Sequence, residues 1–319
     1  MIAYPIRILM VSTFAAAVSA STCFAPAAHA SGPSTSPAAP KLNAQTSRNL
    51  DQSMRGEAFA NASYTLFADE AQGKGLSSTA GLFRRTAQVE LGEHFTEESA
   101  LSGLVGGNAA NLKAASTGEE YEATTMYPTF ARQAKADGDA NAATLFSEIA
   151  KDEANHRDAF LTALKAVQTG KGAIPAAPSV SPVAVQAGLP KVHSARTRAN
   201  LDTVMHGEAL AHAKYSLFAK QAARTGNAAL ARLFNATADV ELREHFTGEA
   251  ALAGTVRETR TNLGKAIAGE LYESRTMYPA FARQAAPVGD TAAAELFRNN
   301  AMDEARHARA FQAARNRLH

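Results

Sequence analysis

The chain is poor in cysteine. Cys23 is the only one among its 319 residues, and it lies in an N-terminal segment that we expect to be cleaved off. The mature chain would then have no thiol, which excludes disulfides, thiol catalysis and every iron or zinc centre held by cysteine. The preceding triplet, Ala20-Ser21-Thr22, matches the leucine-containing lipoprotein motif poorly, so we do not expect a lipid anchor there.

The chain also has no large excess of positive or negative charge. The 32 Lys and Arg residues against 30 Asp and Glu give a formal charge of +2, and no dense basic run gives a reason to expect a nucleic acid or a lipid surface as partner. Apolar residues at 46% and charged residues at 19% are typical of a globular chain. The length allows about two domains.

The one notable apolar run is short. The run 8–18 follows Arg7, and Ala28-His29-Ala30 comes after it, which is the arrangement of a secretory signal peptide and its cleavage site. The run is too short to span a bilayer. We predict a signal peptide over 1–30 and a disordered Ser-, Pro- and Ala-rich stretch over 31–42. The protein would then be secreted, or lie in the periplasm or cell envelope.

Alternating β-branched patterns are missing too, so no segment is predicted to be a strand. Glycine and proline instead divide the rest of the chain into two sets of four long segments rich in Ala, Glu, Arg, Leu and Lys, which are strong helix formers. The Pro-, Gly- and Ala-rich stretch 169–193 cannot be helical throughout and is expected to be a linker. We therefore predict an all-α chain with two tandem antiparallel four-helix bundles, over 43–168 and 194–319.

What the sequence does contain is a long internal repeat. The pattern Gly-Glu-x-Tyr-Glu-x-x-x-Met-Tyr-Pro at 118–128 recurs at 269–279, and the same offset pairs Glu, His and Tyr residues in both halves without a gap. A repeat of this length is a duplicated domain, because solenoid units have periods of about 20 to 50 residues. The pairs include Glu57 with Glu208, Tyr64 with Tyr215, Glu90 with Glu241, His94 with His245, Glu153 with Glu304 and His156 with His307.

Acidic residues interrupt the apolar stripe of each predicted helix near its middle. Glu119 and Glu122 are three residues apart on one helix, as are Glu153 and His156 on the next. A single Glu on a helix is normally a solvated surface residue, but a buried carboxylate costs several kcal/mol unless it is paired, and no Lys or Arg lies on these stripes. Two divalent cations per domain would compensate the charge. Oxygen and imidazole ligands without sulfur suit iron or manganese.

The repeated motifs resemble those of the rubrerythrin branch of the ferritin-like di-iron proteins. The resemblance covers roughly 45–166 and 196–317, and it implies a four-helix bundle with a non-haem di-iron site that reduces hydrogen peroxide. In that family an additional carboxylate on the third helix lets one iron move between a Glu and a His ligand. The implied ligands are Glu57, Glu90, His94, Glu119, Glu122, Glu153 and His156 for the first site, and Glu208, Glu241, His245, Glu270, Glu273, Glu304 and His307 for the second.

Tyrosines recur beside these positions in both repeats. They are candidates to donate hydrogen bonds to the ligand carboxylates, and plain core packing is the alternative for each. They are Tyr64, Tyr121, Tyr127, Tyr215, Tyr272 and Tyr278.

Two features depart from the family pattern. Rubrerythrins proper carry a four-cysteine rubredoxin module that delivers electrons, so here we expect an unknown external electron donor. In the second helix the family spacing is Glu-x-x-His, whereas Glu90 and His94 are four residues apart. The ligand is therefore either Glu90 or Glu93, and correspondingly Glu241 or Glu244. The extra residue predicts a π-bulge near Glu90 that points it inward and Glu93 away.

The two sites are not expected to be equivalent. Asn61 in the first repeat is replaced by His212 in the second. That imidazole lies one turn after the ligand Glu208, so it could approach the second metal pair or hydrogen-bond Glu208; packing at the bundle edge is the alternative.

Three functions are compatible with this pattern. The leading one is a secreted di-iron or di-manganese oxidoreductase that reduces hydrogen peroxide or dioxygen. A protein that binds or sequesters iron or manganese outside the cytoplasm is the alternative. A purely structural pair of bundles would leave the buried charge unexplained. In each case the two repeats would form an intramolecular pseudo-dimer, to which further oligomerisation could be added.

Overall fold

The computed structural model describes residues 41–318. The expected signal peptide over 1–30 and most of the expected disordered stretch over 31–42 lie outside these residues. No helix in the described part of the chain is long and apolar enough to cross a membrane.

Residues 41–318 form helices and connections, without a strand, which confirms the all-α prediction. Short η elements, two in the first repeat and three in the second, join α-helices end to end or extend them, so each repeat has four long rods. The first repeat contains α1 (Ala44–Gly73), α2 (Ser77–Val89), η1 (Glu90–His94), α3 (Phe95–Ser102), α4 (Asn108–Tyr121), η2 (Glu122–Met126), α5 (Tyr127–Ala136) and α6 (Ala140–Thr169). The second contains α7 (Ala195–Arg224), α8 (Ala228–Val240), η3 (Glu241–Phe246), α9 (Thr247–Ala253), α10 (Thr259–Tyr272), η4 (Glu273–Met277), α11 (Tyr278–Ala285), η5 (Ala286–Val288) and α12 (Thr291–Arg317).

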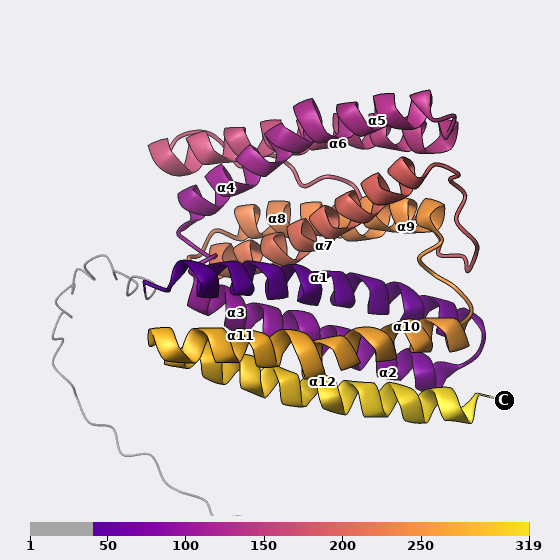
Figure 1. Ribbon diagram of the computed structural model, residues 1–319. Helices are drawn as coiled ribbons and strands as arrows, with labels where there is room; N and C mark the ends of the chain where they lie inside the picture. The colour runs from indigo at the N-terminus through magenta and orange to yellow at the C-terminus, as the bar shows by residue number, and fades with distance from the viewer. Residues whose placement is uncertain (1–40, 319) are drawn as a thin grey trace, which may run out of the picture. The chain divides into compact units, whose positions relative to one another are not determined.

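The two repeats exchange helices. In Figure 1, α1 and α2–α3 of the first repeat lie with α10–α11 and α12 of the second, and we call this group bundle A. Likewise α7 and α8–α9 of the second repeat pack with α4–α5 and α6 of the first, as bundle B. Two four-helix bundles are present, as predicted. The prediction that each repeat closes its own bundle, over 43–168 and 194–319, was wrong.

The exchange follows from the length of the middle connection of each repeat. A ferritin-like bundle needs one long crossover between its two helix pairs. The rod 77–102 is about 39 Å long at 1.5 Å per residue, whereas the connection 103–107 reaches at most about 18 Å. The chain therefore cannot return along its own helix pair, and α4 enters the other bundle. The same holds for the connection 254–258 between α9 and α10.

Aromatic side chains from both repeats fill the core of each bundle. In bundle A the rings of Phe83 and Phe311 lie 5.0 Å apart between centroids, and Tyr64 meets Phe311 at 5.3 Å. In bundle B the rings of Phe160 and Phe234 lie 5.2 Å apart. Such pairs stabilise packing by about 0.5–1.5 kcal/mol beyond the buried area. Because each pair joins different repeats, the core itself holds the exchanged arrangement together.

The predicted linker leaves α6 after Thr169 and continues without helix to α7. It follows the surface of bundle B, where the Val183 N–H donates to the Arg243 carbonyl at 2.9 Å and the Lys191 N–H to the Leu252 carbonyl at 2.8 Å. These backbone bonds hold the linker on the helix that carries η3.

Candidate metal centres

The second rod of each repeat contains a π-helical turn at the predicted place. In η1 the Phe95 N–H donates to the Glu90 carbonyl, five residues back, and η3 is the matching turn in the second repeat. Glu90 and His94 are both buried, whereas Glu93 is exposed. The predicted bulge is confirmed. It directs Glu90, not Glu93, into the bundle.

In the second repeat the same turn directs Glu241 inward and leaves Glu244 outside. The Glu244 carboxylate accepts a hydrogen bond of 2.6 Å from the Ser181 N–H of the linker. Glu244 therefore anchors the linker, and Glu241 is the residue available to a metal.

A second pair of π-turns, η2 and η4, was not predicted. The Tyr127 N–H donates to the Glu122 carbonyl and the Tyr278 N–H to the Glu273 carbonyl. Proline follows each turn at the start of the next helix. Because proline has no N–H and its ring crowds the preceding turn, regular α-helical bonding is interrupted there. The Tyr-Pro dipeptide was the sequence signal for this distortion.

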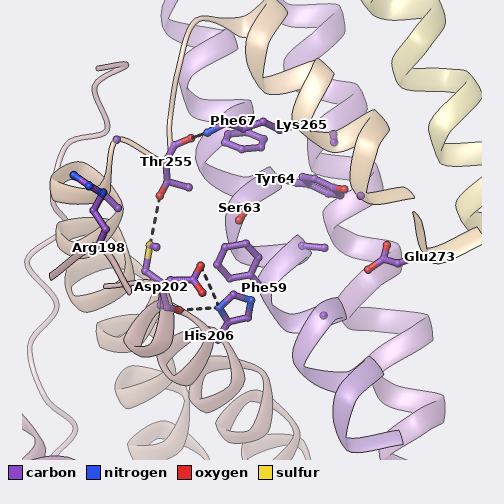
Figure 2. A pocket seen from close by; sticks show the side chains of 17 residues that line it. Phe59, Ser63, Tyr64, Phe67, Arg198, Asp202, His206, Thr255, Lys265 and Glu273 are labelled. Atoms are coloured by element: carbon purple, nitrogen blue, oxygen red, sulfur yellow. Dashed lines mark hydrogen bonds and ion pairs between the residues drawn. The ribbon is translucent and has the colours of Figure 1, made fainter. Parts of the chain in front are cut away.

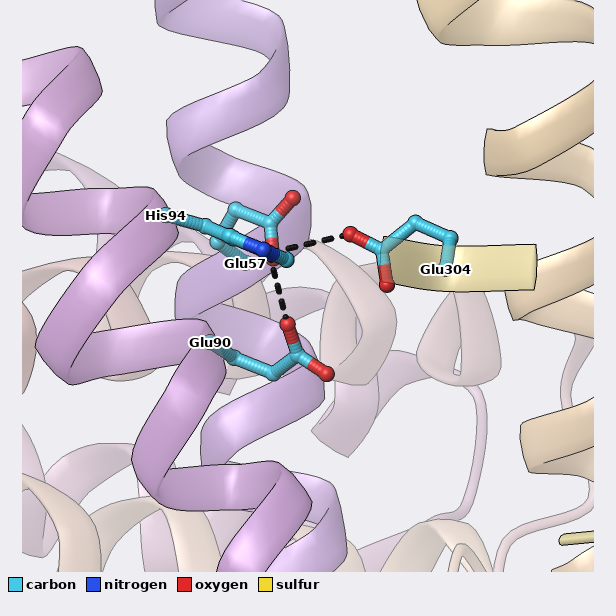
Figure 3. Close-up of side chains that lie close together, drawn as sticks. All are labelled: Glu57, Glu90, His94 and Glu304. Atoms are coloured by element: carbon cyan, nitrogen blue, oxygen red, sulfur yellow. Dashed lines mark ion pairs between the residues drawn. The ribbon is translucent and has the colours of Figure 1, made fainter. Parts of the chain in front are cut away.

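Bundle A brings two overlapping groups of ligand atoms together. One contains Glu57, Glu90, His94 and Glu304, shown in Figure 3, and the other contains Glu90, Glu270, Glu304 and His307. Within each group the ligand atoms lie within 4.8 Å of one another. Glu90 and Glu304 belong to both groups. The two groups could therefore hold two metal ions that share these two carboxylates, and we call the whole set centre A.

Bundle B repeats this arrangement with the roles of the repeats reversed. Its two groups share Glu153 and Glu241, which are the counterparts of the shared pair in bundle A. One group adds Glu208 and His245, and the other adds Glu119 and His156. We call this set centre B.

The residues predicted as ligands thus converge, but not in the predicted sets. Glu57, Glu90 and His94 lie with residues of the second repeat, and Glu153 and His156 with Glu208, Glu241 and His245. The expectation of one site per repeat was wrong, because the short connections send the third and fourth rods into the other bundle.

Glu122 and Glu273 lie beside the centres, outside the convergent groups. Burial raises the pKa of Glu273 well above its usual range, and the neighbouring carboxylates of Glu57 and Glu304 raise it further. Its Oε1 lies against α1 at Gly56, where an added Cβ would come within 3.4 Å of it. Gly207 gives Glu122 similar room. Each centre therefore has a spare carboxylate next to it.

The donor atoms have unmet bonding capacity that a cation would satisfy. His94 Nδ1 lies 3.0 Å from oxygens of both Glu90 and Glu304 and 3.5 Å from Glu57. One N–H cannot serve three acceptors, and ionised carboxylates donate nothing. Both oxygens of Glu90 and one each of Glu270 and Glu304 are buried without a hydrogen-bond partner. The residues therefore fit a pair of iron or manganese ions.

The other ring nitrogen of two ligand histidines faces an aspartate. Asp303 Oδ2 lies 3.7 Å from His94 Nε2, and Asp152 Oδ2 lies 3.7 Å from His245 Nε2. A carboxylate on this side orients the imidazole and directs Nδ1 toward the metal. Sequence reasoning missed both aspartates, although each directly precedes a predicted ligand.

Four of the predicted tyrosines donate hydrogen bonds to ligand carboxylates. Tyr64 donates to Glu270 at 2.6 Å. Tyr278 does so to Glu57, Tyr127 to Glu208 and Tyr215 to Glu119. Tyr121 and Tyr272 are 57% and 53% exposed, so the hydrogen-bonding role predicted for them was wrong.

Glu98 and Glu249 are buried carboxyl groups that sequence reasoning missed. Tyr278 Oη lies 3.0 Å from Glu98 Oε1, and Tyr127 Oη lies 2.8 Å from Glu249 Oε1. Burial raises the pKa of both carboxyl groups well above the usual range. Asn300 Nδ2 also donates to Glu98 Oε1 at 3.1 Å, so Glu98 belongs to a buried hydrogen-bonded network with Tyr278. Its position one turn after His94 on the inward face was the available signal.

His212 does not join centre B. Its Nδ1 lies 2.8 Å from the Ala238 carbonyl, and the Asn61 side chain donates to the matching Ala87 carbonyl at 2.6 Å. Both carbonyls lie in the last turn before a π-bulge. The His212 imidazole therefore supports the bulged helix. The prediction that it approaches the metals or Glu208 was wrong.

Comparison with known proteins shows which family the chain belongs to. A family model described as rubrerythrin matches residues 48–165 and again 239–315. The chain belongs to the rubrerythrin family. A rubrerythrin of Porphyromonas gingivalis is 37% identical over 139 residues, which cover 40% of this chain and 69% of that protein.

Two further relatives show similar levels of identity. A nigerythrin of Nitratidesulfovibrio vulgaris is 38% identical over 134 residues, covering 38% of this chain and 66% of that protein. A symerythrin of Cyanophora paradoxa is 33% identical over 138 residues, covering 42% and 76%. No solved structure was found to match the chain. The resemblance inferred from the motifs is confirmed, and membership of the rubrerythrin family supports a di-iron oxidoreductase of peroxidase type.

Double variants test which ligands share a centre. Glu90→Ala with Glu304→Ala removes the two shared ligands of centre A, so we expect the metal content to fall from about four to about two ions per chain. Glu90→Ala with Glu153→Ala removes one shared ligand from each centre, so both centres should lose metal. Elemental analysis of folded protein would show this, and the opposite pattern would mean that each repeat closes its own site.

The raised carboxyl pKa values predict a pH dependence for the metal-free protein. Burial raises the pKa of Glu90 to about 7 and those of Glu208 and Glu270 to about 8, above about 4.3 for an unfolded Glu. Between about pH 5 and pH 8 the folded state then binds more protons than the unfolded state, so the free energy of unfolding falls as the pH rises.

Metal-loaded protein should behave differently, because metal ions bind the ionised carboxylates and compete with protons. The gap between the Tm values of loaded and metal-free protein should therefore widen as the pH rises over that window. Thermal unfolding followed by circular dichroism at several pH values would measure it. A metal-free Tm that rises with pH would contradict the assignment of these carboxyl groups as buried and unpaired.

Proposed function

We propose that the protein is an exported di-iron oxidoreductase that reduces hydrogen peroxide at centres A and B with electrons from an external donor. The single observation that carries this is the pair of overlapping ligand groups in each bundle, which share Glu90 and Glu304 in one and Glu153 and Glu241 in the other. These shared carboxylates would hold two ions, and such a pair could supply two electrons. Reduction of peroxide to water requires that number.

The chain's own residues prepare the centre for this reaction. When bound, a pair of iron ions supplies the electrons. His94 and His307 each turn Nδ1 toward the shared carboxylates, with nearest distances of 3.0 and 2.9 Å. Glu98 Oε1 lies 3.0 Å from Tyr278 Oη, and the raised pKa of Glu98 favours its protonated form beside the ligand Glu57. Burial of the ligands excludes bulk water, so the carboxylates act in a low dielectric.

A protein that stores or sequesters iron or manganese is the second candidate. The observation in its favour is that the chain has a single cysteine, Cys23, which cannot form a four-cysteine rubredoxin centre. Steady turnover would then depend on an added reductant. The two candidates differ in how fast the reduced centres react with peroxide.

Stopped-flow spectroscopy distinguishes these candidates. Protein loaded with iron and reduced without oxygen should be oxidised faster by hydrogen peroxide than by air-saturated buffer, because peroxide accepts two electrons in one step. The variant with Glu90→Ala and Glu153→Ala, which lacks a shared ligand in both centres, is the control. A faster reaction with dioxygen would instead support a ferroxidase or oxidase.

Export is part of the proposal and is supported by the sequence alone. The apolar run 8–18 and the triplet Ala28-His29-Ala30 have the form of a signal peptide and its cleavage site. Expressed in a bacterial host, the protein should be recovered from the periplasm or medium with an N-terminus at Ser31. Mass spectrometry of the recovered chain would check this. An intact N-terminus in the cytoplasm would remove export from the proposal and leave the chemistry untouched.

A further inference from the structure

A cavity of about 480 Å³ lies between α1, α7 and α10, beside centre A (Figure 2). This volume is in the range of small-molecule binding sites, about 300–1,000 Å³. Glu273 and Tyr64 line the cavity. Tyr64 donates to the ligand Glu270, and the Glu273 carboxylate is close enough to Glu57 and Glu304 to be affected by their charge. The cavity therefore shares two wall residues with the immediate surroundings of centre A.

Aromatic rings make up much of its wall. Phe59 stacks on His206 with centroids 4.0 Å apart and an interplanar angle of 5°, so its ring is held in one orientation. Phe67 and Tyr64 line the cavity as well. A flat aromatic molecule would find offset or edge contacts with these rings, an arrangement that aromatic groups favour.

Two basic side chains and one exposed acidic side chain line the cavity. Arg198 and Lys265 are exposed, and within residues 41–318 their side chains donate only to backbone carbonyls, His193 and Val192 for Arg198 and Thr255 for Lys265. Asp202, next to His206, is the one exposed acid among the lining residues. Arg198 and Lys265 could therefore bind an anionic group on the ligand.

A buried hydroxyl without a partner also lines the cavity. Ser63 is 4% exposed, and its Oγ has no hydrogen-bond partner in the structure. Buried polar groups are normally hydrogen-bonded. A ligand with a hydroxyl group would satisfy Ser63 Oγ.

The matching place in bundle B carries different residues. Lys214 stands where bundle A has Ser63, and Leu210 where it has Phe59. The Lys214 ammonium lies 5.9 Å from the Tyr215 ring centroid. Burial raises the pKa of Glu122, and the positive charge of Lys214 opposes that rise. A lysine side chain thus approaches the spare carboxylate of centre B, in the region where bundle A has open space.

We propose that this cavity binds the external electron donor of centre A, and that the donor is a small anionic hydroquinone. This rests on the proposed function. The hydroquinone loses two electrons and two protons to become a quinone. With iron bound at centre A, these two electrons and two protons would balance the reduction of one hydrogen peroxide molecule, whose O–O bond breaks, to two molecules of water. Lys214 keeps the donor away from centre B.

Direct binding tests this without any metal. The probe is 2,5-dihydroxybenzoate, a hydroquinone with a carboxylate, titrated into metal-free protein by isothermal calorimetry. We expect one molecule bound per chain. Ser63→Lys, which installs the residue of bundle B, should weaken binding at least about tenfold. Lys214→Ser is the matched control and should leave the affinity of the cavity in bundle A unchanged.

A second pair of variants covers a failure of Ser63→Lys to fold. Phe59→Leu and Lys265→Ala install the residues that bundle B has at the matching positions, Leu210 and Ala114. Each should lower the affinity while circular dichroism and metal content stay the same. Benzoate, which lacks the hydroxyl groups, should bind more weakly than the probe because it leaves Ser63 Oγ unpaired.

Electron delivery is measured separately on iron-loaded, oxidised protein. The probe should reduce one centre and not both, and Ser63→Lys should abolish this reduction. Dithionite-reduced Ser63→Lys protein should still react with peroxide at both centres. If that peroxide reaction fails in the wild type, the proposed function fails; if it succeeds and the probe neither binds nor reduces centre A, only the donor cavity is wrong. Equal losses in Ser63→Lys and Lys214→Ser would also overturn it.

Discussion

The rest of the structure depends on carboxylates that are buried without a protein counter-charge. Each bundle turns four glutamates inward at one level and places a fifth beside them, with histidines as the only basic partners in direct contact. Burying one unpaired ion costs several kcal/mol, so these groups would destabilise an ordinary helix bundle. Two divalent cations per bundle would remove that cost. With metal bound, the bundle could therefore keep these carboxylates in its core.

The local distortions of the helices serve this same requirement. The π-turns at Glu90 and Glu122, with their counterparts in the second repeat, rotate carboxylates that a regular helix would aim elsewhere. Side chains then hydrogen-bond to backbone carbonyls next to these turns, as Asn61 does by donating to the Ala87 carbonyl. Glycine at Gly56 leaves room for the spare carboxylate of Glu273. The π-turns, the glycines and these side-chain hydrogen bonds thus belong to one arrangement, which places the ligand atoms of each group within 4.8 Å of one another.

Helix exchange ties the two repeats into one unit. Because centre A takes ligands from α1, η1, α10 and α12, neither repeat holds a complete centre by itself, and the linker is not what keeps the bundles together. Exchange also lets the two bundles diverge while their ligands stay matched. The ligand pairs are identical in type, whereas Ser63 and Lys214 make their surroundings different. Duplication therefore produced two similar centres with different surroundings.

By itself the sequence determined what local periodicity controls: helices at every rod, the inward residue types, the π-bulge from the four-residue spacing of Glu90 and His94, and the family. Only the tertiary structure decided which residues share a centre. The ligand stripes of both repeats are the same, so either pairing satisfies them, and the reach of 103–107 decides between the two. The roles of Glu98 and of the cavity beside Ser63 also depended on contacts between rods far apart in the chain. Helical periodicity tells which side of a rod faces inward, but not which rod it faces.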